Sequence, residues 1–161
     1  LDENIKNHEL IASDKFANIQ HLAKFILIHT FSHLIIKELE FLVGYPATSM
    51  NERLFIDESE MAGVLIYTVA GAEGSYGGLV TQGKEDTFKK ILLSAMNRAT
   101  DCASDPVCLN SIDGQGVGGL NIAACYACTL LPETSCEEFN SFLDRGLLID
   151  PHNGFFRELI L

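Results

Sequence analysis

The sequence predicts an α+β fold, a single domain with a long central helix, a small sheet and a loop-rich lobe that holds the cysteines. Three observations predict this class. An apolar stretch of about thirty residues repeats at helical spacing, residues 64–69 have the composition of a strand, and all five cysteines fall between residues 102 and 136. A chain of 161 residues has room for one well-formed core. No repeat or linker divides the chain, so residues 1–161 are predicted to be one domain.

The first element is a helix over residues 14–43. Its apolar positions recur three or four residues apart, Ser13 or Asp14 is available as the N-cap, and Gly44, followed by a Tyr-Pro pair, ends it. Between residues 25 and 36 the pattern is apolar almost all round. We therefore expect this helix to be central and covered on several sides.

Two short strands and a second helix follow. Residues 53–56 predict a strand, and the continuous β-branched run at residues 64–69 is typical of a buried strand. This run leads into a glycine-rich loop at residues 71–78. Residues 85–99 then show the clearest amphipathic helix of the chain, because their apolar side chains recur at helical spacing from Phe88 onward.

The last third of the chain is rich in loops. Ser135, followed by Glu137 and Glu138, predicts a capping box that opens a short helix through Leu143. Residues 150–154 predict a turn, and residues 159–161 predict a final strand. A region with so little regular structure needs another source of order.

The charge of the chain excludes one class of function. The sequence has 22 acidic and 11 basic residues and a formal net charge of -11. Phosphate backbones repel a module of this charge, so we do not expect the domain alone to bind nucleic acid non-specifically. A local patch or a basic partner could still bring DNA into contact. The acidic clusters, such as residues 57–60, are predicted to be solvated surface or, alternatively, a face for a basic partner.

The sequence given contains no targeting or membrane signal. Its most apolar run, residues 25–36, is shorter than the roughly 20 residues that cross a bilayer. The opening residues lack the basic stretch and apolar core of a signal peptide. We expect a cytoplasmic protein with no membrane partner. Because the chain starts at Leu1 rather than Met, we also expect it to be a fragment of a larger protein.

The cysteines have the spacing of a metal site. Cys102 and Cys108 form a C-x5-C pair, and Cys125 and Cys128 form a C-x2-C pair after sixteen intervening residues. Two thiolate pairs separated by a loop can supply the four soft ligands of tetrahedral Zn²⁺. A turn at Asp105-Pro106 can close the wider pair. These four cysteines are our candidate metal ligands.

Zinc would supply the order that residues 102–136 lack. The glycine-rich segment between the two pairs has little apolar content, so the free energy of metal binding would become folding free energy for this lobe. No general base stands beside the cysteines in the sequence. We therefore predict a closed structural site and no catalytic residue.

Other interpretations of the cysteines remain open on spacing alone. Disulfides would need an oxidising compartment, of which the sequence gives no sign, and five is an odd number. A redox C-x2-C motif would follow a βα turn, and Cys125 does not follow a recognisable one. An iron–sulfur cluster also uses four cysteines, so the spacing alone does not exclude it. Cys136 is the spare thiol, and it is the main rival to one of the four candidates.

The same segments resemble a known family. Residues 102–108 (CASDPVC), 119–128 (GLNIAACYAC) and 131–137 (LPETSCE) are similar to the MrfA-type zinc-binding (MZB) domain, in particular to the form found in the DISARM anti-phage defence system. The HTFSHL segment that starts at His29, the glycine loop and residues 140–145 also fit this pattern. The resemblance covers about residues 25–148.

The resemblance implies a C-terminal accessory domain attached to a superfamily 2 helicase or working beside one. On this basis we expect a helicase subunit or helicase domain as the protein partner, DNA contact only through the complex, and a scaffolding role without catalysis. The resemblance also implies Zn²⁺ bound by Cys102, Cys108, Cys125 and Cys128, and it leaves Cys136 unassigned.

The alternative hypothesis is a hydrolase or nuclease acting near His29, His33 and the loop at residues 71–78. The two histidines lie one helical turn apart and could share a metal, but the segment lacks the glutamate of a zinc-protease helix and no third ligand is identifiable. They could instead form a satisfied buried network or the polar floor of a pocket. The loop could cradle an anion. Asp144 and Arg145 could form an ion pair, or Arg145 could contact a phosphate.

Overall fold

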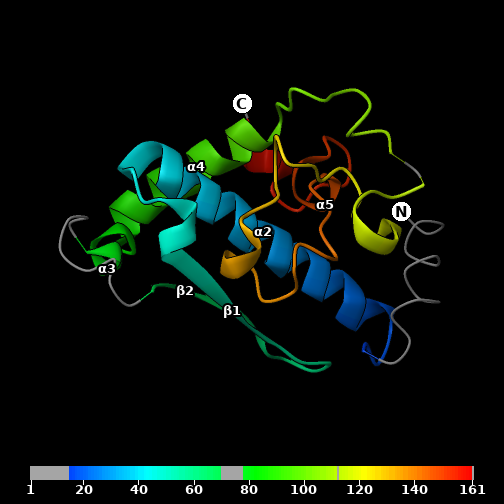
Figure 1. The fold of residues 1–161 in the computed structure, drawn as a ribbon, viewed down its shortest axis with the longest axis horizontal. Coiled ribbons are helices and arrows are strands. Elements are labelled where there is room, and N and C mark those ends of the chain that lie inside the picture. The colour runs from blue at the N-terminus through cyan, green and yellow to red at the C-terminus, as the bar shows by residue number, and fades with distance from the viewer. Residues whose placement is uncertain (1–14, 70–77, 112, 161) are drawn as a thin grey trace.

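Helix α2 (Ile19–Val43) runs through the middle of the molecule, and the other elements pack around it (Figure 1). The computed structural model describes residues 15–69, 78–111 and 113–160. After α2 come the strands β1 (Met50–Ile56) and β2 (Ala62–Thr68), and then α3 (Leu79–Gln82), α4 (Glu85–Ala99) and α5 (Gly146–Ile149). The predicted α+β class, with its central helix, small sheet and loop-rich cysteine lobe, is confirmed.

Helix α2 begins later than predicted. The Asn18 side chain caps it by accepting the His21 N–H at 2.8 Å. The start predicted at residue 14 is therefore wrong, because residues 15–18 are not helical. The predicted caps Ser13 and Asp14 lie outside the described residues.

The end of α2 and its central position are both confirmed. Gly44 has a φ of 79°, and its N–H donates to the Glu40 carbonyl, which closes the helix as predicted. The successive residues Leu34, Ile35 and Ile36 are 4%, 2% and 0% exposed. Neighbouring side chains on a helix point about 100° apart, so three buried in a row require cover on more than one side.

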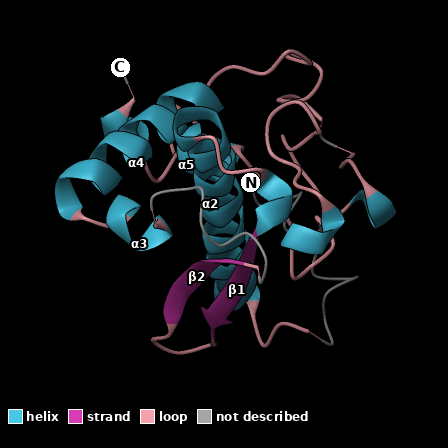
Figure 2. Cartoon of the chain, turned by 60° about the vertical axis from the view of Figure 1, so that its left-hand side comes forward, coloured by secondary structure: helices cyan, strands magenta, loops and turns pink. Residues whose placement is uncertain are grey.

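Strands β1 and β2 form an antiparallel hairpin in which Met50 lies opposite Thr68. The hairpin packs against α2 (Figure 2). β1 is longer than the strand predicted at residues 53–56. The expectation that the second strand is buried is wrong, because Leu65 is 51% exposed and Tyr67 is 40% exposed. A continuous apolar run does not reveal how many faces of a strand are covered.

Helix α4 forms over residues 85–99 as predicted. Ile91 and Ala95 are among the side chains that it buries against α2. A polar contact also joins the two helices: Glu38 of α2, which has no exposed surface, accepts from Ser94 Oγ and from Arg98 Nε, both at 2.7 Å. Hydrophobic burial and a satisfied buried carboxylate therefore hold α4 beside α2.

The helix predicted at residues 136–143 does not form. Phe139, Asn140 and Phe142 have φ values of 51°, 59° and 62°. These are left-handed conformations, in which a right-handed helix cannot continue. The short helix of this region is α5 instead, and it begins only at Gly146.

The end of the chain is partly as predicted. The turn at residues 150–154 is confirmed, since the Gly154 N–H donates to the Asp150 carbonyl at 2.7 Å. The final strand is wrong, because Arg157–Leu159 is a 3-10 turn. Leu161 and residues 71–77 of the glycine loop lie outside the described residues. None of the helices among the described residues is long and apolar enough to cross a membrane.

Candidate metal centre

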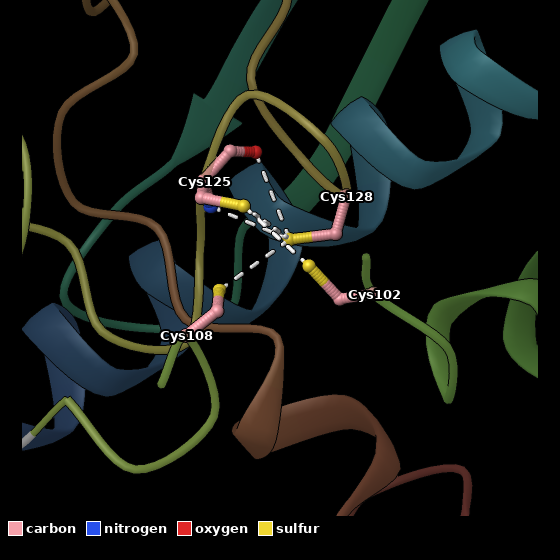
Figure 3. Close-up of side chains that lie close together, drawn as sticks. All are labelled: Cys102, Cys108, Cys125 and Cys128. Atoms are coloured by element: carbon pink, nitrogen blue, oxygen red, sulfur yellow. Dashed lines mark hydrogen bonds between the residues drawn. The ribbon is translucent and has the colours of Figure 1, made fainter. Parts of the chain in front are cut away.

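The four candidate zinc ligands come together beside helices α2 and α4. Cys102 follows the C-terminal end of α4, Cys108 lies in the next turn, and Cys125 and Cys128 lie in a second turn further along the chain. Their sulfur atoms point toward one another (Figure 3). All four ligand atoms lie within 4.8 Å of one another.

The spacing of the sulfur atoms fits a tetrahedral metal ion. The Sγ–Sγ distance is 3.5 Å from Cys102 to Cys125, and 3.8 Å from Cys128 to both Cys108 and Cys125. A tetrahedron with a metal–sulfur distance of about 2.3 Å has edges of about 3.8 Å. A disulfide would need a distance of about 2.05 Å, and all five cysteines are free. Four thiols at this spacing are a donor set that suits Zn²⁺.

Two hydrogen-bonded turns bring the paired cysteines together. The Cys108 N–H donates to the Ser104 carbonyl at 2.9 Å, so the chain turns at Asp105-Pro106 as predicted. The Cys128 N–H donates to the Cys125 carbonyl at 3.2 Å and closes the shorter pair. Each pair is therefore ordered locally, but joining the two pairs needs contacts between distant segments.

Arg145 makes that connection. Its guanidinium is fully buried, and Nη2 lies 2.8 Å and 2.9 Å from the two carboxylate oxygens of Asp105. Nη1 donates to the Ala99 carbonyl at 2.7 Å and Nε donates to the Ala123 carbonyl at 3.2 Å. The acceptors belong to the segments that carry the cysteines. The ion pair predicted with Asp144 is made with Asp105 instead, and burial keeps Arg145 from any phosphate.

Positive charge and hydrogen-bond donors surround the cysteine turns. Lys37 of α2 donates to the backbone carbonyls of Tyr126 and Leu130 at 3.3 Å and 3.2 Å. Burial of the Cys125 thiol would raise its pKa, but hydrogen bonds from Ser104 and from nearby backbone N–H groups outweigh burial and lower the pKa to about 6. This thiol is thus readily converted to the thiolate that a metal binds.

Cys136 is not part of this cluster. It lies with His29, His33 and Glu52, four buried side chains whose ligand atoms also fall within 4.8 Å of one another. Nε2 of His29 is 3.0 Å from Glu52 Oε1 and 3.2 Å from Cys136 Sγ. Nε2 of His33 is 3.3 Å from the same Glu52 oxygen. The sequence offered no third partner for the two histidines because Glu52 and Cys136 belong to other elements of the fold.

The burial of this second cluster answers the question left open for the two histidines. His29 and His33 have no exposed surface, so they belong to a buried network and do not form the floor of an open pocket. Burial lowers the pKa of His33. Burial raises the pKa of Glu52, but the two histidines beside its carboxylate outweigh burial and hold that pKa well below its usual range. A substrate has no path to these side chains in this conformation.

Comparison with known proteins agrees with this geometry. Residues 31–129, which include all four cysteines of the centre, match the model of the MrfA Zn-binding domain (MZB). Over 141 residues, 84% of this chain, the sequence is 39% identical to the DISARM protein DrmB of Bacillus paralicheniformis. The aligned region is 25% of that protein, so the chain spans about a quarter of its relative's length. Zn²⁺ is the metal cofactor of this domain, and the chain belongs to the MrfA Zn-binding domain family.

Proposed function

We propose that this chain is a non-catalytic, zinc-stabilised accessory domain of a DISARM-type anti-phage defence protein in the cytoplasm. Its role is to scaffold a helicase partner, and DNA is engaged through that complex. The observation that carries the proposal is the convergence of four thiols from loop segments that have little apolar packing of their own. The relationship to the DISARM protein DrmB supports the defence context.

The metal's role in this proposal is structural. Cys102, Cys108, Cys125 and Cys128 would hold the ion, and four protein ligands leave no open position for a water or a substrate. Bound zinc would tie the loops after α4 to the turn at residues 125–128. Because the unfolded chain has no preformed site, the free energy of zinc binding would stabilise the folded lobe. The rigid lobe then keeps its place against α2 and α4.

An apolar groove offers a surface for the helicase partner. It has a volume of about 680 Å³ and is lined by residues of α2, β2, α3 and α4. Val80, Leu65 and Tyr67 in its lining are 90%, 51% and 40% exposed. Contiguous exposed apolar surface of this kind is typical of protein interaction sites. The net charge of -11 favours a partner with a basic face.

Co-purification with the helicase of the same defence system tests this proposal. Leu65→Asp places a charge in the groove, and we expect it to weaken helicase binding at least about tenfold, a loss of about 1.4 kcal/mol. Val117→Asp is the matched control, because Val117 is 85% exposed and does not line the groove. Unchanged zinc content and circular dichroism would show that both variants fold. Equal helicase binding by wild type and Leu65→Asp would contradict the groove as the docking surface.

A further inference from the structure

The buried cluster of His29, His33, Glu52 and Cys136 joins three parts of the fold. The two histidines stand one turn apart on α2, Glu52 comes from β1, and Cys136 follows the 3-10 turn Glu133–Ser135. Each of the four side chains is at most 6% exposed. Burying two imidazoles, a carboxylate and a thiol together is costly unless each polar atom has a partner.

The hydrogen bond of His33 shows that this cluster has too few hydrogen-bond donors. Nδ1 of His33 lies 3.1 Å from the Thr129 carbonyl oxygen, which can only accept, so Nδ1 carries the hydrogen. In a neutral imidazole Nε2 then presents a bare lone pair. That lone pair lies 3.3 Å from Glu52 Oε1, itself an acceptor. Two acceptors that face each other at this distance need a cation or an extra proton between them.

The surroundings of Cys136 are those of a metal-bound thiolate. Its Sγ accepts the backbone N–H groups of Glu138 at 3.4 Å and Asn140 at 3.1 Å. The positive φ values of Phe139 and Asn140 bend the chain around the sulfur. Backbone donors around a ligand sulfur, and a carbonyl that fixes the tautomer of a ligand histidine, are the usual outer contacts of protein metal sites.

Two atoms of the cluster, Glu52 Oε2 and His29 Nδ1, have no hydrogen-bond partner among the described residues. Both atoms are buried. Leaving a carboxylate oxygen unpaired in the interior costs a desolvation penalty that an ion beside it would offset. The acceptor pair, the thiolate contacts and this orphaned oxygen thus indicate the same missing component, a cation.

We propose that His29, His33, Glu52 and Cys136 form a second metal site, which binds a divalent ion of the Zn²⁺ type. Two imidazole nitrogens, one carboxylate oxygen and one thiolate sulfur are a donor set that suits tetrahedral Zn²⁺, whose ligand–ligand distances would be about 3.3 to 3.6 Å. The three distances that join these donors, 3.0, 3.2 and 3.3 Å, lie within a few tenths of an ångström of that range.

This second site is separate from the four-cysteine centre. The two share no ligand, and His29 and Cys136 lie outside the stretch that matches the family model. Thr129 connects them, because its hydroxyl donates to Cys128 Sγ at 3.2 Å while its carbonyl accepts from His33. Four protein ligands, each at most 6% exposed, make the second ion structural, and it would fasten α2 to β1 and to the segment at residue 136.

X-ray absorption on the wild-type chain, purified without added chelator, tests the second site without any variant. With both sites filled, mass spectrometry should find two zinc ions per chain, and the absorption spectrum should show five sulfur and three nitrogen or oxygen ligands shared between them. One ion with a sulfur-only shell would overturn the second site. One ion bound by both sulfur and nitrogen or oxygen ligands would support the second site and contradict the four-cysteine centre.

Variants assign the ions to their ligands. Cys136→Ala and His29→Asn should each lower the content from two ions to one, and Cys125→Ser should remove the other. Ser32→Ala is the matched control, since Ser32 is buried beside His33 on α2 and its hydroxyl has no partner among the described residues. It should keep two ions. A folded Cys136→Ala variant that also keeps two ions would overturn the proposal.

Discussion

Arg145 and Asp105 form an ion pair across forty residues of chain, and it fastens the start of α5 to the loop between the first two cysteines. The guanidinium has no exposed surface, whereas 23% of the Asp105 side chain is exposed. Both carboxylate oxygens accept from the same nitrogen, Nη2. The remaining donors hold the carbonyls of Ala99 and Ala123, so one side chain connects the segments that carry the cysteines.

We therefore predict that Arg145→Met destabilises the domain by about 3 kcal/mol or more, the usual cost of removing one member of a buried pair. The change leaves the Asp105 carboxylate and two buried carbonyls without these donors. Urea unfolding measures the stability, and competition with a chelator measures zinc retention, which we expect to fall as well.

Arg157→Met is the matched control for that variant. The Arg157 side chain is 44% exposed, pairs with the exposed Glu158 and donates to the Gly154 carbonyl at 3.1 Å, so its loss should change stability by less than about 1 kcal/mol. If Arg145→Met unfolded at the same urea concentration as the control and kept its zinc, the ion pair and hydrogen bonds of Arg145 would make no contribution to the stability of the domain.

The second prediction concerns the four-cysteine centre. We expect Cys125→Ser to lower the zinc content by one ion per chain and to loosen residues 102–136, because this lobe has few apolar contacts to replace the metal. Hydrogen exchange should become faster in that lobe while amides of α2 and α4 stay protected. Tyr126→Ala, in the same turn but 84% exposed, is the control and should keep its zinc. Full zinc in Cys125→Ser would contradict the ligand assignment.

The features that the sequence predicted well are those set by local spacing. The amphipathic pattern of residues 85–99 gave α4 with its correct ends, and the two cysteine pairs came together as expected. Helix α4 and the turn that closes each cysteine pair follow from contacts within a few residues of chain, whereas joining the two pairs needs contacts between distant segments. The partners of the histidines could not be found this way, because Glu52 enters the cluster from β1 and Cys136 from a segment 107 residues beyond His29.

The failed helix at residues 136–143 shows how tertiary contacts overrule a local signal. The Asn140 side chain bridges the backbone of Leu131, accepting its N–H and donating to its carbonyl, both at 2.8 Å. Glu137, which lies within the predicted capping box, instead accepts the Leu54 N–H at 2.8 Å. These bonds to distant parts of the chain favour an irregular path with positive φ. A capping box in the sequence cannot reveal them.

The third prediction is that the domain alone binds DNA weakly at physiological salt. Its net charge of -11 repels the phosphate backbone, and the buried Arg145 is withdrawn from the surface. A gel-shift titration with duplex DNA should therefore show no tight complex until the helicase is added. Tight binding by the domain alone that weakens steeply with added salt would contradict this expectation.

The fourth prediction separates the scaffold from the hydrolase or nuclease. Because His29 and His33 are fully enclosed, the wild-type domain should show no saturable turnover of nucleotide or DNA. His33→Ala should change metal content and stability without removing an activity. Turnover by the wild type that the His33→Ala variant loses would favour the enzyme instead.

The fifth prediction is a pH dependence that originates at Asp144. Burial raises the pKa of this carboxyl to about 6, compared with about 4 in an unfolded chain. A raised carboxyl pKa means that the folded state binds the proton more tightly. The wild type therefore gains stability from this group as the pH falls through 6 toward 4, and at pH 7.5 the partly buried charge costs roughly 2–3 kcal/mol.

Asp144→Asn removes the charge and keeps an oxygen that can accept the Gly146 N–H, a hydrogen bond of 2.8 Å in the wild type. We expect its free energy of unfolding to exceed that of the wild type by roughly 1–2 kcal/mol at pH 7.5, and the difference to vanish near pH 4. Urea titrations at both pH values measure it. Asp113→Asn makes the same change of net charge at an exposed turn and should show no such difference. A difference that grew toward pH 4 would contradict this expectation and would rule out the Asp144 carboxyl as its source.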